Sequence, residues 1–383
     1  MGTWKQVVAS EFIEFNPKET LKKGTIAPKI SMDILAPFTR KVSSYTQESY
    51  NGGTKFRNQD TIMARITPCL ENGKTSMVDI LPEDTVGFGS TEYIVFRARS
   101  GISDSKFVYY LACSNVIRDI AIKSMVGSSG RQRVQQSVVN NIEFMAPALE
   151  EQKRIAAVLS SLDDKIELNN VINENLANLL QTYYQLSFGD VDTSSKKGIL
   201  SDICCFSKEK ISVSEIDVNS YYSTENMLPQ KGGATEATSL PNIQQTTACH
   251  AGNTLISNIR PYFKKIVYCQ KECGCSTDVL CFTPIQTCYT AYLFSTLYAD
   301  RFFDFMVAGS KGTKMPRGDK QQIMTYPIII PSADELDAFN CVAIPILKQM
   351  DDTRSENSHL SAMRDTLLPK LMSGEIDVAN ATV

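Results

Sequence analysis

Residues 150–184, EEQKRIAAVLSSLDDKIELNNVINENLANLLQTYY, decide the architecture that we expect for this chain of 383 residues. Apolar residues recur there at alternating steps of four and three, which is the heptad seam of a long helix. Glu150 and Glu151 suit the positive end of a helix dipole, and Gly189 is a suitable stop. We predict a helix over 149–189, and we expect its pairing positions to be Ile155, Leu159, Leu162, Ile166, Asn169 and Leu176.

A second helical stretch, residues 332–377, is the natural partner of the first. Pro345 and Pro369 lie inside it, and because proline lacks a backbone N–H, we expect a kink or break near 343–344 and a second irregularity at Pro369. Two long helices separated by one domain pair most simply as an antiparallel coiled coil. The alternative is that each helix packs on its own domain. The pairing positions expected in this stretch are Leu347, Met350, Leu360 and Leu367.

Segments upstream of the two helices match each other in order, which indicates an internal repeat. Ser90–Phe96 resembles Ser276–Phe282, and Gly127-x-x-Gly130 resembles Gly309-x-x-Gly312. The segments mix strand patterns with short helical ones, so we predict an α+β fold of two similar domains, each followed by a long helix, with pseudo-two-fold symmetry. The predicted boundaries are 1–148 for the first domain, 149–189 for the first helix, 190–331 for the second domain, 332–377 for the second helix and 378–383 for a tail.

The charge is distributed in blocks although the net charge is only −3. Net charges of +4 over 1–148 and +3 over 193–331 alternate with −5 over 149–192 and −5 over 332–383. Basic domains favour contact with phosphates. The sequence has 11 cysteines, no apolar run of membrane-spanning length and no apolar signal core, so we expect a cytoplasmic protein with reduced thiols.

Four loops, at matching places of the two repeats, carry the residue types that bind DNA phosphates and base edges. In the first repeat we expect DNA contacts from Arg65, Asn72, Lys74, Ser128, Ser129, Arg131, Gln132 and Arg133. In the second repeat we expect them from Asn258, Arg260, Tyr262, Lys264, Lys311, Thr313, Lys314 and Arg317. The alternative for each loop is an ordinary solvated surface.

The string EEQKRIAAVLSSLDDKIELNN (150–170), together with the domain–helix–domain–helix order and the closing TLLPKLMSGEID (366–377), resembles the specificity subunit of type I restriction-modification systems. The resemblance implies two target-recognition domains, each reading one half of a split site in double-stranded DNA, on a spacer of two helices. It implies docking of two modification subunits, which methylate adenine with S-adenosylmethionine, and of restriction subunits with an ATP-driven translocase. It implies no cofactor in this chain. DELDAFNCVAIP (334–345) departs from the family's usual helix opening, which makes the second docking surface less secure.

No catalytic centre is expected in this chain. The Asp/Asn-Pro-Pro-Tyr/Phe motif of amino-methyltransferases and the glycine-rich nucleotide loops are missing from the sequence. The cysteines from Cys249 to Cys281 could suggest zinc, but the first repeat has no matching cysteines, so we expect no metal. A scaffold that joins two protein partners without DNA remains the main alternative function, and a self-contained methyltransferase is a less favoured one.

Overall fold

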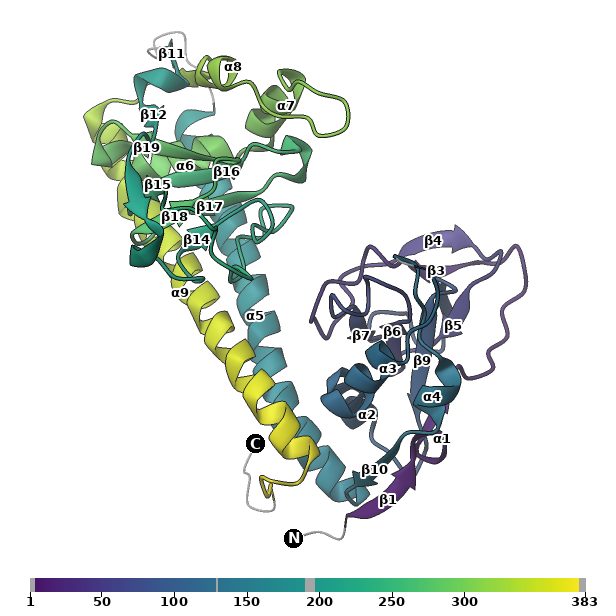
Figure 1. Ribbon diagram of the computed structural model, residues 1–383. Coiled ribbons are helices and arrows are strands. Elements are labelled where there is room, and N and C mark those ends of the chain that lie inside the picture. The colour runs from purple at the N-terminus through teal and green to yellow at the C-terminus, as the bar shows by residue number, and fades with distance from the viewer. Residues whose placement is uncertain (1–3, 129, 190–196, 379–383) are drawn as a thin grey trace. The chain divides into compact units, whose positions relative to one another are not determined.

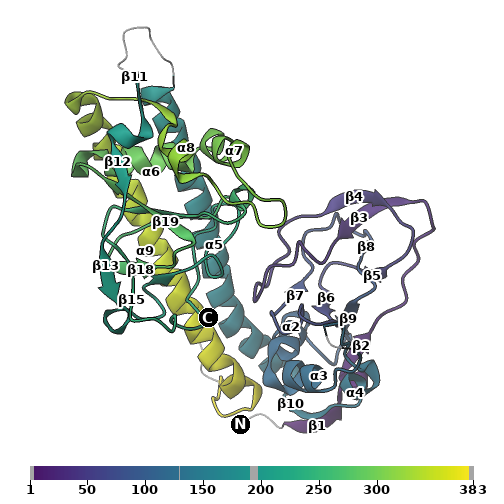
Figure 2. The ribbon, with the colours of Figure 1, turned by 45° about the horizontal axis from the view of Figure 1, so that its top comes forward.

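The computed structural model describes residues 4–128, 130–189 and 197–378. The chain divides into two compact units, Met1–Leu168 with Glu356–Val383, and Asn169–Ser355. Each unit therefore contains one globular domain and a stretch of both long helices, as the ribbons in Figures 1 and 2 show. The predicted tail from residue 379 and the predicted start of the second domain, residues 190–196, lie outside the described residues.

Unit 1 contains two four-stranded sheets. The first is antiparallel throughout, in the order β2 (Ile13–Phe15), β9 (Tyr93–Ala98), β6 (Thr61–Ala64), β7 (Thr75–Met77). In the second, β3 and β8 are parallel, and the order is β4 (Thr46–Ser49), β3 (Ile26–Ile30), β8 (Gly87–Gly89), β5 (Thr54–Phe56). The shorter elements are β1 (Lys5–Val8), paired with β10 (Glu143–Ala146), and α1 (Ala9–Phe12), α2 (Ser105–Cys113), a π-helical turn (Asn115–Asp119), α3 (Ile120–Lys123) and α4 (Gln136–Asn140).

The first sheet of unit 1 is buried on both faces, because successive side chains of a strand point in opposite directions. Met63 and Ile94 pack with α2 in one apolar core. Their neighbours Ile62 and Val95 pack with the second sheet in another. Asp104 accepts a hydrogen bond from the Phe107 N–H at 2.9 Å, which caps the start of α2.

Unit 2 repeats this plan, so the predicted fold class is confirmed. Its first sheet has the order β12 (Cys204–Phe206), β19 (Val279–Pro284), β16 (Thr254–Ser257), β17 (Ile266–Tyr268), again antiparallel. Its second sheet has the order β13 (Lys210–Ser212), β15 (Gln245–Cys249), β18 (Cys273–Cys275), β14 (Tyr221–Tyr222). The other elements are β11 (Lys197–Ile199) paired with β20 (Pro327–Ile329), α6 (Thr290–Tyr298), α7 (Asp300–Ala308), α8 (Lys320–Met324) and 3₁₀ turns at Leu200–Asp202, Val213–Glu215, Pro261–Phe263 and Thr287–Tyr289.

The second sheets differ only in their added edge strand. Three strands are equivalent, since β3 and β14 are each parallel to the central β8 or β18, and β5 and β15 are each antiparallel to it. In unit 1 the fourth strand, β4, extends the β3 edge, whereas in unit 2 β13 extends the β15 edge. The insertions between equivalent strands therefore vary while the three-stranded core is kept.

The long helices are α5 (Leu149–Phe188) and α9 (Ala333–Met372). In unit 1, Lys165 of α5 pairs with Glu356 of α9 at 3.3 Å, and Asp163 pairs with Arg364 at 2.8 Å. Residue numbers fall along α9 as they rise along α5, so the helices are antiparallel there, as predicted. In unit 2, the Tyr183 ring of α5 stacks on Phe339 of α9 with 5.4 Å between centroids.

The positions that we expected to pair differ in their burial. Five are buried, namely Ile155, Leu159, Asn169, Leu347 and Met350. The other five are half-buried, namely Leu162, Ile166, Leu176, Leu360 and Leu367. Leu159 and Leu371 belong to the same apolar core in unit 1.

The predicted break in the second helix is wrong, because α9 continues through both Pro345 and Pro369. Proline removes one backbone donor, but the residues on either side of Pro345 hold the helix in place. Ala343 and Leu347 are buried in the core of unit 2, and Leu371 beyond Pro369 is buried in the core of unit 1. Tertiary packing therefore outweighs the local penalty.

Candidate nucleic-acid interface

The two predicted loops of unit 1, 65–75 and 126–136, lie side by side. Arg133 forms isolated β-bridges with both Ile66 and Val126. The Thr67 N–H also donates to the Gln132 carbonyl at 3.0 Å. Backbone bonds thus join two loops that are far apart in the sequence into one surface.

Unit 2 joins its equivalent loops, 258–265 and 308–322, in the same way. Arg317 forms isolated β-bridges with Ile259 and Lys311. The Arg260 N–H donates to the Pro316 carbonyl at 2.8 Å. The loop pair is therefore a repeated feature of both units, with Arg317 at the place that Arg133 has in unit 1.

Each of these two arginines is held by a carboxylate at an equivalent position. Nε and Nη2 of Arg133 donate to the Glu92 carboxylate at 2.7 to 3.0 Å. Nη2 of Arg317 lies 3.1 Å from Oδ1 of Asp278. The hydrogen bonds between the two side chains lower the pKa of Glu92 and raise the pKa of Arg133, so both groups stay charged. A guanidinium held in this way keeps further N–H groups for a ligand, because it has five donors in a fixed plane.

Glu92 and Asp278 are not among the residues predicted from the sequence, although the matched segments Ser90–Phe96 and Ser276–Phe282 contain them. They are the third residues of the strings Ser90-Thr91-Glu92 and Ser276-Thr277-Asp278. The repeated acidic residue next to a repeated serine and threonine was the signal that could have found them.

The other predicted residues of unit 1 differ in exposure. Ser128, Arg131 and Asn72 are exposed, and Gln132 is half-buried. Arg65 lies 3.9 Å from Glu92. Nζ of Lys74 donates to the Met32 carbonyl at 2.7 Å, so this ammonium is already engaged within the domain. Ser129 lies outside the described residues.

In unit 2, Tyr262, Lys311, Thr313 and Lys314 are exposed. Nζ of Lys264 is paired with Asp300 at 2.8 Å. Arg260 is half-buried and adopts the left-handed conformation with φ of 51°. Asn258 is only 8% exposed, and its Oδ1 has no hydrogen-bond partner among the described residues.

A cavity of about 690 Å³ opens beside the joined loops of unit 2. Arg260 and Met315 line it from the two loops, and Asp278 lines it from the start of β19. The remaining lining residues include the hydroxyl groups of Thr224 and Ser276. The wall therefore combines polar groups with apolar side chains such as Phe263 and Leu240.

Five cysteines of unit 2 form part of a buried apolar core. Cys249, Cys269, Cys273, Cys275 and Cys281 lie together there, and the sulfurs of Cys269 and Cys273 are 3.6 Å apart. Within residues 4–128, 130–189 and 197–378, no group of three or more histidine, cysteine or acidic side chains is arranged to hold a metal ion. Over the same residues, no helix has both the length and the apolar character that a membrane span requires.

Comparison with known proteins finds similar sequences and a similar fold. Residues 1–178 match the model of the type I restriction modification DNA specificity domain. The type I restriction enzyme EcoAI specificity subunit of Escherichia coli is 35% identical over 173 residues, which are 43% of this chain and 29% of that protein. The MjaIX specificity subunit of Methanocaldococcus jannaschii is 24% identical over 306 residues, which are 72% of this chain and 69% of that protein.

The matched part of this chain thus spans less than a third of the EcoAI subunit's length. Among solved structures, the S subunit of a type I restriction-modification system from M. genitalium superposes with a TM-score of 0.57 at 16% identity. That alignment covers 97% of this chain and 96% of the other, and it supports the fold of both units. Residues 1–178 are therefore similar to the DNA specificity domain of type I restriction-modification systems, and the fold of both units is that of a solved S subunit.

Proposed function

We propose that the chain selects the DNA sequence for a type I restriction-modification enzyme by reading a split site in double-stranded DNA. The two reading domains are residues 1–148 and 190–331, and each reads one half-site. The observation that carries the proposal is the repeated arginine–carboxylate pair, Arg133 with Glu92 and Arg317 with Asp278, on equivalently joined loops.

The chemistry of these pairs suits DNA. Arginine binds phosphates and the O6 and N7 atoms of guanine through two parallel N–H bonds. Glu92 occupies Nε and one side of Nη2 of Arg133, which leaves the Nη1 edge for DNA. Because the carboxylate restricts the guanidinium in advance, less side-chain entropy is lost on binding.

The long helices are proposed to dock two modification subunits, which methylate adenine with S-adenosylmethionine, and also the restriction subunits of such a system. This chain itself is proposed to bind no cofactor and to catalyse no step. Exposed apolar side chains on α5 support protein docking, since a hydrated helix face is normally polar. They are Leu168, Val171, Leu179 and Leu186, which are 53% to 80% exposed.

An electrophoretic mobility shift with the cognate modification subunits tests the proposal. The target is found first, by mapping methylated adenines in the host genome with and without the gene. We expect sequence-selective binding that weakens steeply as salt rises, because phosphate contacts release counterions. Arg133→Ala is expected to relax selection in one half-site and Arg317→Ala in the other, by about 1–3 kcal/mol each.

The matched control is Arg154→Ala, which removes an exposed arginine of α5 outside the loops. It is expected to keep the base preference of both half-sites. A chain that assembles with its partners but binds no duplex selectively is a protein scaffold, and that result would reject the proposed function.

A further inference from the structure

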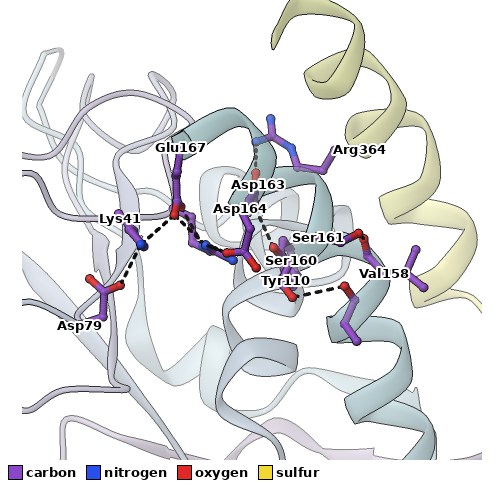
Figure 3. A network of polar contacts seen from close by, with 12 residues as sticks. Lys41, Asp79, Tyr110, Val158, Ser160, Ser161, Asp163, Asp164, Glu167 and Arg364 are labelled. Atoms are coloured by element: carbon purple, nitrogen blue, oxygen red, sulfur yellow. Dashed lines mark hydrogen bonds and ion pairs between the residues drawn. The ribbon is translucent and has the colours of Figure 1, made fainter. Parts of the chain in front are cut away.

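A polar network in unit 1 ties the first domain to a short stretch of α5, residues 163–167 (Figure 3). Asp163 accepts from the Tyr110 hydroxyl of α2 at 2.6 Å and from Nη1 of Arg364 of α9 at 2.8 Å. Asp164 and Glu167 accept from Arg40, which lies in the segment between β3 and β4. Groups from a loop, α2 and α9 thus converge on one side of α5.

Arg40 makes the most demanding contact of this network. Its side chain is only 5% exposed, and its Nε and Nη2 donate to the two oxygens of Glu167 at 3.0 and 2.8 Å. Nη2 also bonds to Asp164. Burial opposes the charge, but the bonds to Glu167 and Asp164 outweigh it and raise the pKa of Arg40. Lys41, the next residue, adds a second ion pair to Glu167 at 2.9 Å.

The backbone around Arg40 is hydrogen-bonded to β7, a strand of the first sheet of unit 1. The Met77 N–H of β7 donates to the Arg40 carbonyl at 2.8 Å. The Ser76 hydroxyl donates to the Thr39 carbonyl at 2.9 Å. β7 pairs with β6, and the predicted DNA loop 65–75 connects these two strands. A path of hydrogen bonds therefore runs from α5 through Arg40 to β7, the strand that follows that loop.

The helix of unit 2 that corresponds to α2 contacts α5 through aromatic rings instead. Tyr292 of α6 corresponds to Phe107 of α2 when the starts of the two helices are aligned, and its hydroxyl donates to the Ile329 carbonyl at 2.6 Å. Its ring packs on Phe188 and Tyr184 of α5 with centroid distances of 4.9 and 5.7 Å. Apolar packing is non-directional, whereas a bidentate arginine–carboxylate pair works in one geometry. A buried ion pair adds little net stability but can select one arrangement, so the ionic contact of unit 1 suits a positioning role.

We propose that Arg40 is a positioning residue that fixes the angle of the first domain on its helices and thereby restricts the DNA gap that the chain accepts. The inference rests on the proposed function. One base pair of gap rotates one half-site relative to the other by about 35°. A domain whose orientation on α5 is fixed by the Arg40 contact cannot follow that rotation, whereas a domain without this contact can.

The test uses the complex with its modification subunits and duplexes whose gap is native, one base pair longer or one base pair shorter. We expect wild-type binding to weaken at least about tenfold on either altered gap, which is about 1.4 kcal/mol. For Arg40→Ala we expect that discrimination to fall to about threefold or less, with unchanged base preference in both half-sites. Asp164→Asn combined with Glu167→Gln is expected to behave alike, because it breaks the same contact from the helix side.

Lys165→Ala is the matched control, since it removes an ion pair between α5 and α9 that does not involve the domain. It is expected to keep wild-type gap discrimination, and Arg40→Lys is expected to restore it only in part, because lysine lacks the planar fork. If Arg40→Ala does not fold, the variant Asp164→Asn with Glu167→Gln provides the test, because both changes keep the size of the side chain and the two residues are 56% and 18% exposed. Wild-type gap discrimination in the variants, or an equal loss on all three gaps, would overturn the proposal. Failure of the wild-type complex to bind any split site would instead reject the proposed function.

Discussion

Replacing Tyr110 with phenylalanine removes one hydroxyl from the polar network and leaves the ring in place. That hydroxyl donates to Asp163 at 2.6 Å in a buried site. A hydrogen bond to a charged group contributes about 1.5–3 kcal/mol to stability. Asp163 keeps its ion pair with Arg364 in the variant, so the carboxylate still has a charged partner. We therefore expect the free energy of unfolding to fall by the lower part of that range, about 1.5–2 kcal/mol.

The assay is urea unfolding followed by the fluorescence of Trp4. The sequence has one tryptophan, and its Nε1 donates to Glu151 at the start of α5, so the signal reports on unit 1. With a slope of about 2 kcal/mol per molar urea, the midpoint is expected to fall by about 0.8–1 M.

Tyr109→Phe is the control for this prediction. Tyr109 is buried beside Tyr110, with 5.0 Å between the ring centroids, but the Asp163 oxygens accept from Tyr110 and Arg364. We expect its midpoint to shift by less than about 0.3 M. Equal shifts in the two variants would refute the reasoning, because the charged acceptor would then make no difference.

Three further predictions concern unit 2. The hydrogen bond of His250 to Glu209 raises the pKa of the imidazole, and the bond to Glu272 adds to this effect. The charged histidine therefore stabilises the fold below about pH 6.5, and this contribution is lost as the pH rises through the raised pKa. Titration of the ring by NMR should give a pKa above 6.5 that falls in Glu209→Gln, and a value at or below 6.5 would contradict this. Iodoacetamide should modify the exposed Cys205 and Cys341 in the folded protein before the buried cysteines, as peptide mass spectrometry can check. Phe339→Ala should destabilise unit 2 by about 3–5 kcal/mol, read by calorimetry, and an unshifted thermogram would reject it.

The sequence pattern was sufficient for the elements that repeat or that follow a clear period. The heptad spacing around Leu159 predicted a helix close to the observed Leu149–Phe188. The matched segments predicted two domains of the same fold, because a duplicated pattern must satisfy the same packing twice. The four DNA-binding loops could be predicted for the same reason, because they lie at matching places in the two repeats.

The features that the sequence did not reveal depend on contacts between distant residues. Arg40 and Glu167 are 127 positions apart, and Arg40 belongs to no motif or repeated segment that would connect it with the helix string containing Glu167. The continuity of α9 through Pro345 also depends on tertiary packing of Ala343 and Leu347, which local propensity does not include. The repeated fold does not imply a repeated attachment to the helices.

The nature of these contacts, the ion pairs of Arg40 and the rings around Tyr292, has a consequence for temperature and salt. Apolar attraction weakens as water is cooled, and the desolvation cost of a buried ion pair also grows as the temperature falls. Cooling should therefore loosen the contact of Tyr292 with Tyr184 and Phe188 and that of Arg40 with α5 together. Added salt should have little effect on the contact of Arg40, because a side chain that is only 5% exposed is poorly screened by ions.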